Sequence, residues 1–327
     1  MKIEDLQTPA LLVEAEALEH NLHVMAAALP GQRLRPHVKA HKCTALARRQ
    51  AGVGHRSFTC ATIREVEGLV AAGLGDDLLL ANEVVDARRL GRLAGRVTVA
   101  VDSEPTIVAA AAGGVHEVVI DVNVGLPRCG CRAEDAGRLA DLARARGLTV
   151  RGVMGYEGHV VGLDDGALRA RLTEEAMQIL LAAHAQVGGE LVSAGGTGTY
   201  ACNTWANEIQ AGSYLLMDTT YAKLGLPFRQ ALAVLATVIS VSAGYAVADC
   251  GLKALGMDHG NPTIQGARVL FCSDEHVTFV PEEAVKVGDR IRVWPAHIDP
   301  TVAYHERMQL VVDDEVSDSW AVDLRGW

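Results

Sequence analysis

One basic stretch near the N-terminus, Arg33–Lys42, combines residue types that suit covalent chemistry. Pro36 disfavours a helix at this point, so the stretch is expected to be extended. Alternation along an extended chain places four side chains on one face: Arg35, His37, Lys39 and His41. Burial and neighbouring positive charge both favour a neutral amine on Lys39, the form that condenses with a carbonyl group to a Schiff base. The alternative is a solvated basic strand edge.

A glycine-rich loop, Ser193–Thr199, is the second candidate. Its glycines allow the backbone to approach an anion closely, and Thr197 and Thr199 supply hydroxyl groups. Gly212 and Ser213 follow one structural unit later and could complete a phosphate cradle. A plain tight turn is the competing interpretation.

The third candidate is the segment Pro295–Pro300, in which extended geometry would place His297 and Asp299 on one face. One imidazole and one carboxylate suit Zn²⁺, Mn²⁺ or a similar ion with open coordination positions. The motif is short, so a surface loop is the alternative.

The elements that must position these residues change character near residue 228. Before it, short apolar runs alternate with amphipathic helical stretches, which predicts βα units and a (β/α)8 barrel over residues 1–228. The first expected barrel strand is Ala10–Glu14 and the second is the lysine stretch, although the first few residues could instead join the other domain. Residues 229–327 predict a β-rich domain. Barrel active sites lie at the carboxyl ends of the strands, where the expected strands end near five candidates: Lys39, Thr62, Arg128, Tyr156 and His159.

Composition excludes several classes of function. Lys plus Arg is 30 and Asp plus Glu is 40, a net charge of -10 that argues against nucleic acid and anionic membranes as partners. No apolar run is long enough to span a bilayer. Seven cysteines without a disulfide-like pattern fit a reduced, cytoplasmic location, and Cys129 and Cys131 are expected to be packing residues rather than metal ligands.

Together, the lysine stretch, the segments Asp121–Gly130 and Gly155–His159, the glycine-rich loop and His297–Val302 resemble the D-threonine aldolase and D-serine dehydratase family. These are fold-type III pyridoxal phosphate enzymes related to alanine racemase. The resemblance implies a homodimer of barrel and β domain, with pyridoxal 5′-phosphate and a divalent metal (Mn²⁺, Mg²⁺ or Zn²⁺) as cofactors.

The same resemblance implies a role for each candidate residue. Lys39 would be the Schiff-base lysine, and His297 and Asp299 the metal ligands. The remaining cofactor-binding positions would be Thr62, Arg128, Tyr156, Thr197, Gly198, Thr199, Gly212 and Ser213. His-x-Asp is more typical of the aldolases and His-x-Cys of the dehydratases, so Asp299 favours an aldolase.

The expected reaction is retro-aldol cleavage of a small D-β-hydroxy-α-amino acid to glycine and an aldehyde, with His159 or a metal-bound water as the candidate base. The alternative is a dehydratase that converts D-serine or D-3-hydroxyaspartate to a 2-oxo acid and ammonia. A racemase and a non-catalytic pyridoxal phosphate carrier are further alternatives. The segment from His159 to Glu190 is short for the family. Loops that shape the substrate pocket are therefore expected to differ, which affects the choice of substrate more than the cofactor chemistry.

Overall fold

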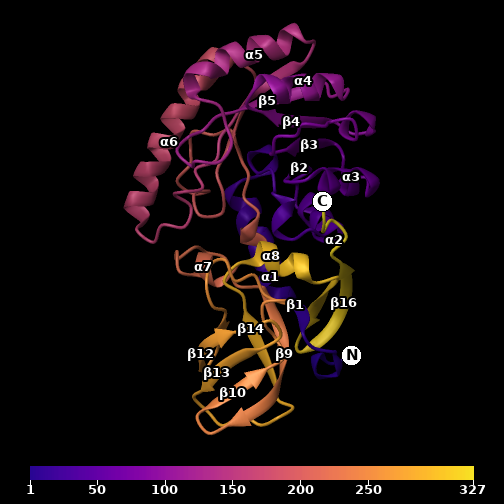
Figure 1. Cartoon of the computed structure of the whole chain (residues 1–327), viewed down its shortest axis with the longest axis vertical. Coiled ribbons are helices and arrows are strands. Elements are labelled where there is room, and N and C mark those ends of the chain that lie inside the picture. The colour runs from indigo at the N-terminus through magenta and orange to yellow at the C-terminus, as the bar shows by residue number, and fades with distance from the viewer. The chain divides into compact units, whose positions relative to one another are not determined.

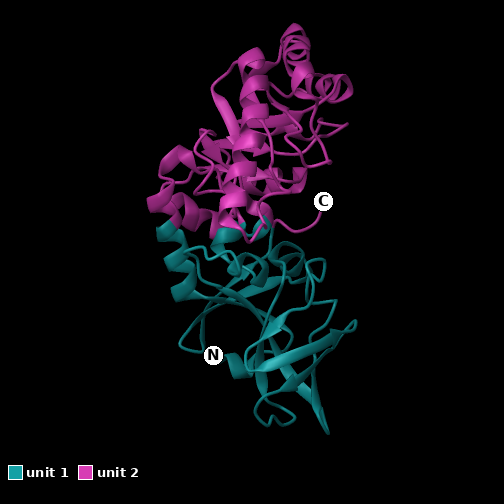
Figure 2. Ribbon diagram, turned by 90° about the vertical axis from the view of Figure 1, so that its left-hand side faces the viewer, with its two compact units in different colours: residues 1–24, 40–45, 213–323 teal, residues 25–39, 46–212, 324–327 magenta.

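A computed structural model describes residues 1–327 and divides the chain into two compact units (Figure 2). Unit 1 comprises residues 1–24, 40–45 and 213–323, and unit 2 comprises residues 25–39, 46–212 and 324–327. None of the helices has both the length and the apolar character that a membrane crossing requires.

Unit 2 is built on a parallel sheet whose seven strands neighbour one another in chain order (Figure 1). The strands are β2 (Ser57–Cys60), β3 (Asp77–Leu80), β4 (Val97–Val101), β5 (Glu117–Asp121), β6 (Thr149–Met154), β7 (Leu191–Ala194) and β8 (Glu208–Ile209). One core layer takes a side chain from each of five consecutive strands: Leu79, Ala100, Val119, Met154 and Leu191. Strands that are buried on both faces are typical of parallel sheets, which explains their nearly continuous apolar sequence.

The basic stretch closes this sheet into a barrel. Leu34 forms a parallel bridge with Ile209 of β8, and His37 forms one with Thr59 of β2. The amide of Thr59 donates to the carbonyl of Pro36 at 2.9 Å. The stretch therefore occupies the eighth strand position, and the predicted (β/α)8 barrel is confirmed.

Helices follow most of the strands, as a barrel of βα units requires. They are α2 (Thr44–Gly52), α3 (Ile63–Ala71), α4 (Glu104–Ala112), α5 (Ala136–Ala145) and α6 (Gly166–Val187). Figure 1 shows α4, α5 and α6 along the outside of the strands. The segment after His159 that is short for the family holds α6.

Unit 1 contains a nine-stranded sheet in the order β10-β13-β12-β11-β14-β9-β1-β15-β16. An additional pairing of β10 with β9 closes six of these strands into a ring, so the predicted β-rich C-terminal domain is confirmed as a largely antiparallel barrel. The strands are β1 (Ala10–Glu14), β9 (Leu232–Ser242), β10 (Tyr245–Ala248), β11 (Thr263–Ile264), β12 (Ala267–Cys272), β13 (Val277–Pro281), β14 (Arg290–Trp294), β15 (Arg307–Val312) and β16 (Glu315–Ala321). Helices α1 (Ala15–Ala28), α7 (Thr219–Ala222) and α8 (Ile298–Tyr304) complete the chain.

The prediction that Ala10–Glu14 is the first strand of the (β/α)8 barrel was wrong. This segment is β1 of the nine-stranded sheet, where it pairs antiparallel with β9 and parallel with β15. The apolar run predicted a buried strand correctly, but periodicity does not identify the sheet that a buried strand joins. The domain boundary at residue 228 stays a prediction, and unit 1 begins its long segment at Ser213.

Candidate active site

The carboxyl edge of the barrel in unit 2 gathers most of the predicted site residues. All of its strands are parallel, so the segments that leave them emerge at one edge of the sheet. Five predicted positions follow these strand ends: Lys39, Thr62, Arg128, Tyr156 and His159. The glycine-rich loop leaves the same edge after β7, and Gly212 follows β8.

Lys39 is half-buried and lies within a single 3₁₀ turn, Val38–Ala40. This turn ends the extended backbone after His37, so the prediction that four cationic side chains share one face was wrong. The ring of His41 is buried, and its Nδ1 accepts the amide of Cys43 at 3.2 Å. Its position beyond the turn is not the one that alternation implied.

Arg35 belongs to an ion-pair network in the barrel rather than to a cationic surface around Lys39. It is almost completely buried, and its guanidinium contacts Glu208 at 2.8 Å and Asp77 at 3.0 Å. Arg151 contacts the other oxygen of Asp77 at 2.8 Å. Burial alone would raise the pKa of Asp77, but the hydrogen bonds and charges of Arg151 and Arg35 outweigh it and lower that pKa to about 2.

Arg128 and Tyr156, two of the predicted cofactor contacts, lie together. The Arg128 guanidinium carbon is 5.5 Å from the centre of the Tyr156 ring. A Cβ on Gly196 of the glycine-rich loop would lie 3.4 Å from the same ring, so the loop packs directly against Tyr156. The structure thus brings three predicted parts of the cofactor site into contact within unit 2.

His159 is exposed, and its ring covers Gly125, where a Cβ would come within 2.7 Å of the ring carbon Cε1. Gly125 lies in the loop between β5 and Arg128. The two loops that carry the predicted cofactor contacts therefore pack on each other, and the His159 ring remains open to solvent at their rim.

Glu157 is a residue that sequence reasoning missed. Its side chain is completely buried and accepts hydrogen bonds from the amide of Gly195, the hydroxyl of Thr199 and the side-chain amide of Asn203. Tyr156 and His159 in the same segment were predicted site residues, but nothing in the sequence indicates that the glutamate between them is buried.

Thr62 has a clear local role at the start of α3. Its Oγ1 accepts the amide of Glu65 at 3.2 Å, and the Glu65 carboxyl group accepts the amide of Ala61 at 2.6 Å. This arrangement satisfies amide groups that a helix N-terminus leaves without helical partners. The hydroxyl proton of Thr62 is not used by this cap, so the cap and a cofactor contact are compatible.

The Cys129 and Cys131 thiols are unsuited to nucleophilic chemistry at neutral pH. Burial, together with the neighbouring carboxyl groups, raises the pKa of Cys129 to about 11 and that of Cys131 to about 12. Burial and the nearby Glu83 also raise the pKa of Asp121, which is 5% exposed.

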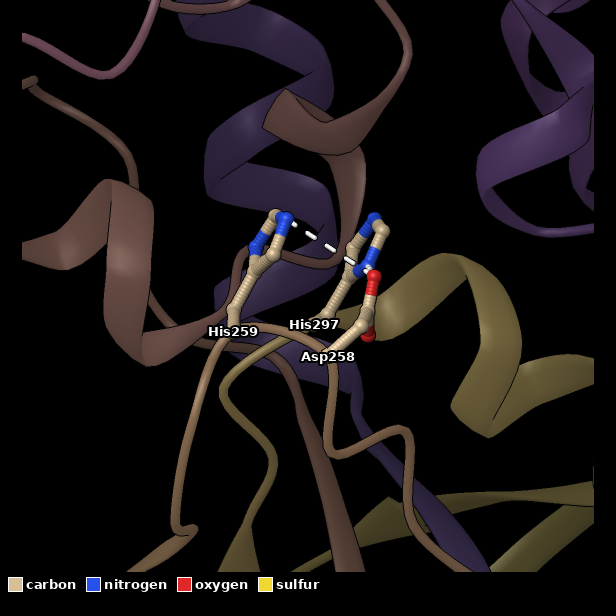
Figure 3. A group of neighbouring side chains, drawn as sticks. All are labelled: Asp258, His259 and His297. Carbon is tan, nitrogen blue, oxygen red and sulfur yellow. Dashed lines mark hydrogen bonds and ion pairs between the residues drawn. The ribbon is translucent and has the colours of Figure 1, made fainter.

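A separate group in unit 1 contains His297, one of the two predicted metal ligands, together with Asp258 and His259 (Figure 3). Nδ1 of His297 lies 2.7 Å from an oxygen of Asp258, and the rings of His259 and His297 stack with centres 4.0 Å apart. On the opposite side of its ring, Nε2 of His297 is 4.0 Å from Oδ1 of Asp299. Asp258 and His259 were not predicted, because their sequence position gives no indication that they approach His297.

The extended geometry predicted for the His297-x-Asp299 motif was wrong. His297 has an extended backbone, but it is the N-cap of α8, and Asp299 lies in the first turn of that helix. The buried Asp218 accepts the amide of Ile298 at 3.2 Å, and Lys42 Nζ donates to the carbonyl of Asp299 at 2.7 Å. The helix start, rather than strand alternation, therefore brings the two side chains to one side.

Two families match the chain in consecutive segments. Residues 13–220 match the family described as alanine racemase, N-terminal domain, and residues 231–311 match the one described as putative serine dehydratase domain. The first match alone covers more than half of the chain.

Individual proteins are similar over nearly the whole chain. A D-threonine aldolase from an Arthrobacter species is 34% identical, covering 98% of this chain and 93% of its own. A 3-hydroxy-D-aspartate aldolase from Paracoccus denitrificans is 32% identical, covering 100% and 94%. The crystal structure of a D-threonine aldolase from Filomicrobium marinum superposes with a TM-score of 0.92 at 34% identity, covering 98% and 96%. The chain therefore belongs to the D-threonine aldolase and D-serine dehydratase family of alanine racemase-like, pyridoxal phosphate-dependent enzymes.

Proposed function

We propose that this protein is a lyase that cleaves a D-β-hydroxy-α-amino acid, such as D-threonine, to glycine and an aldehyde. Full-length similarity to D-threonine aldolase is the observation that carries the proposal. The closeness of an imidazole and a carboxylate at the start of α8 supports a metal-assisted reaction.

For the cofactor, we propose that Lys39 binds pyridoxal phosphate covalently and that Arg128 and Tyr156 contact its ring. The glycine-rich loop is the proposed phosphate site, because it leaves the carboxyl edge of the barrel after β7 and packs on Tyr156. Thr62, Thr197, Gly198, Gly212 and Ser213 are the further proposed contacts. Pyridoxal phosphate supplies the electron sink for the charge that develops at the substrate Cα.

For the metal, we propose His297 and Asp299 as ligands of Mn²⁺, Mg²⁺ or Zn²⁺. Two ligand atoms that each lie about 2.1 Å from one ion are at most ~4.2 Å apart, so the 4.0 Å between Nε2 and Oδ1 fits with a small inward movement. Asp258 occupies Nδ1 of His297, which leaves Nε2 to face the ion. The ion supplies a Lewis acid for the substrate β-hydroxyl group.

We propose that His159 takes the proton of this hydroxyl group as the Cα–Cβ bond breaks. Its ring is exposed at the rim of the loops that carry Arg128 and Tyr156, which supports a role beside the proposed cofactor site. An imidazole is suited to this step because its usual pKa lies near neutrality.

The runner-up is a dehydratase that uses the same residues, and the match of residues 231–311 to a putative serine dehydratase domain supports it. Lys39 would then remove the Cα proton, and hydroxide would leave from Cβ. A racemase would not need His297 or Asp299. A non-catalytic carrier would not need the β domain that carries them.

We also propose that the protein is a cytoplasmic homodimer. All seven cysteines are free in the structure, which supports a reducing compartment. Sedimentation analysis of the purified protein at several concentrations tests the dimer, and a monomer at all of them would contradict it.

Metal removal tests the proposed reaction class. We expect EDTA to abolish cleavage of D-β-hydroxy amino acids and added Mn²⁺ to restore it, because no other group is proposed to activate the β-hydroxyl as a Lewis acid. The Lys39→Ala variant should lack both activity and the visible absorbance of lysine-bound cofactor. Cleavage at the full rate in EDTA would contradict the metal-dependent reaction, whereas racemisation without cleavage, unchanged by EDTA, would favour a racemase.

A further inference from the structure

Glu157 lies below the glycine-rich loop and is 0% exposed. The amide of Gly195 donates to Oε2 at 3.1 Å, while the Thr199 hydroxyl and the Asn203 amide donate to Oε1 at 2.8 Å and 3.0 Å. These three donors come from the start of the loop, its end and the turn that follows. Because buried polar groups are stable only when paired, the carboxyl group ties the two ends of the loop together.

Thr199 belongs to this frame. A threonine hydroxyl group has one proton, and Thr199 donates it to Glu157. The same oxygen accepts the amide of Gly196 at 3.1 Å. The Thr199 hydroxyl and the amides of Gly195 and Gly196 therefore all make hydrogen bonds within the protein, and none of them is directed at an outside anion.

The segment that carries Glu157 also contacts the middle of the loop. The carbonyl of Glu157 accepts the amide of Val160 at 2.9 Å, which forms a turn. A Cβ on Gly198 would lie 1.8 Å from the carbonyl oxygen of Val161, so only glycine permits this approach. One turn thus holds the loop at its ends through the carboxyl group and at its centre through the backbone.

We propose that Glu157 is a positioning residue that holds the glycine-rich loop in the conformation that accepts a phosphate monoester. It follows that Thr199 contributes to phosphate binding through Glu157 and not by direct contact. This proposal deepens the cofactor assignment made above and rests on it.

The test compares pyridoxal phosphate with pyridoxal, which lacks the phosphate group. Binding of each to the apoprotein is measured by absorbance titration. In Glu157→Gln, an NH₂ group replaces one of the two carboxyl oxygens. Each of these oxygens accepts a hydrogen bond in the wild type, so at least one hydrogen bond to the loop is lost. We expect the dissociation constant for pyridoxal phosphate to rise about tenfold or more, with that for pyridoxal unchanged.

Substitutions of Thr199 keep the test independent of how Glu157→Gln folds. Thr199→Val removes the hydroxyl group at nearly constant shape, so it should weaken the binding of pyridoxal phosphate but not that of pyridoxal. Thr199→Ser keeps the hydroxyl group, and this variant should bind pyridoxal phosphate as tightly as the wild type. The double variant Glu157→Gln/Thr199→Val should bind no more weakly than the worse single variant, because both changes remove the same connection. Glu174→Gln, the same exchange at an exposed position, is the matched control.

Three results would overturn the proposal. They are wild-type affinity in Glu157→Gln, equal loss of pyridoxal phosphate and pyridoxal in the folded variants, and additive effects in the double variant, which would mean that Thr199 contacts the phosphate itself. A wild-type protein that binds no pyridoxal phosphate would instead contradict the cofactor assignment.

Discussion

At the residue scale, Asp77 links two buried arginines in the barrel of unit 2. Arg151 and Arg35 both bond its carboxylate, and they lower its pKa to about 2 from an ordinary 3.8. A carboxyl group whose pKa is lowered by folding stabilises the fold above its unfolded pKa, and this contribution is lost as the pH falls through the folded pKa.

This pKa difference predicts how the free energy of unfolding falls at acid pH. Between roughly pH 4 and pH 2, the wild type should lose about 2 kcal/mol of unfolding free energy through Asp77. Asp77→Asn should be less stable at neutral pH and should lack this part of the pH dependence. Denaturant unfolding at several pH values measures both effects, with Asp76→Asn at the exposed neighbouring position as the control. An equal fall at acid pH in Asp77→Asn and the wild type would contradict this role.

Asp258 has a separate predicted role as a carboxylate that orients His297. Mutation of a residue that is hydrogen-bonded to a metal-ligating histidine typically lowers the metal affinity about 10- to 100-fold. We therefore expect Asp258→Ala to weaken Mn²⁺ binding by that order and Asp258→Asn by less, because its side-chain oxygen can still accept from Nδ1. Paramagnetic resonance of free Mn²⁺ measures the affinity, and Glu283→Gln is an exposed control.

The same titration distinguishes two ligand sets. Asp258, His259 and His297 offer ligand atoms within 4.8 Å of one another and could themselves hold an ion. If His297 and Asp299 are the ligands, Asp299→Asn should weaken Mn²⁺ binding strongly and His259→Ala only slightly. The reverse order would replace Asp299 by His259 in the site.

At the element scale, Thr62 connects the start of α3 to the proposed cofactor site. Thr62→Ala should lower the free energy of unfolding by about 1 kcal/mol, because the helix cap is lost. It should also weaken the binding of pyridoxal phosphate. Thr62→Asn should restore the cap but not the cofactor affinity, since it lacks the hydroxyl group. Thermal unfolding and absorbance titration separate the two effects. If Thr62→Asn binds the cofactor as tightly as the wild type, Thr62 is a cap residue alone.

The sequence predicted strands better than turns. The runs that became β2 to β7 are apolar because both of their faces are buried, and this pattern is readable without a structure. The helix start at His297 is stabilised by a hydrogen bond from the amide of Ile298 to the distant Asp218, which a local pattern does not contain. The 3₁₀ turn at Lys39 was likewise not indicated by the alternation of residues in the basic stretch. The sequence therefore names candidate residues, but it did not predict the local geometry of Lys39 and His297.

At the scale of the whole molecule, the N-terminal strand belongs to the sheet formed by the C-terminal part of the chain. Strand β1 lies between β9 and β15, and its Leu12 is completely buried in a cluster with Leu6, Leu235 and Val311. No local signal in residues 10–14 indicates a partner more than two hundred residues away. Buried polar residues such as Glu157 were unpredictable for the same reason, because their partners come from elsewhere in the fold.

Strand β1 predicts how the ends of the chain depend on each other. Leu12→Ala should destabilise unit 1 by about 2–5 kcal/mol, the usual cost of such a cavity. Val241→Ala, at an exposed position in the same sheet, should change stability by less than about 0.5 kcal/mol. Hydrogen exchange resolves the loss by segment, and we expect faster exchange in β9 and β15. Unchanged exchange in both strands would contradict the central position of β1.

The central claim concerns which bond of the substrate breaks, and product analysis with D-threonine tests it most directly. The protein, loaded with pyridoxal phosphate and Mn²⁺, is incubated with D-threonine, and the products are identified by mass spectrometry, with Lys39→Ala as the inactive control. Cleavage between Cα and Cβ predicts equal amounts of glycine and acetaldehyde. Formation of 2-oxobutyrate and ammonia in their place would contradict the aldolase assignment and establish the dehydratase.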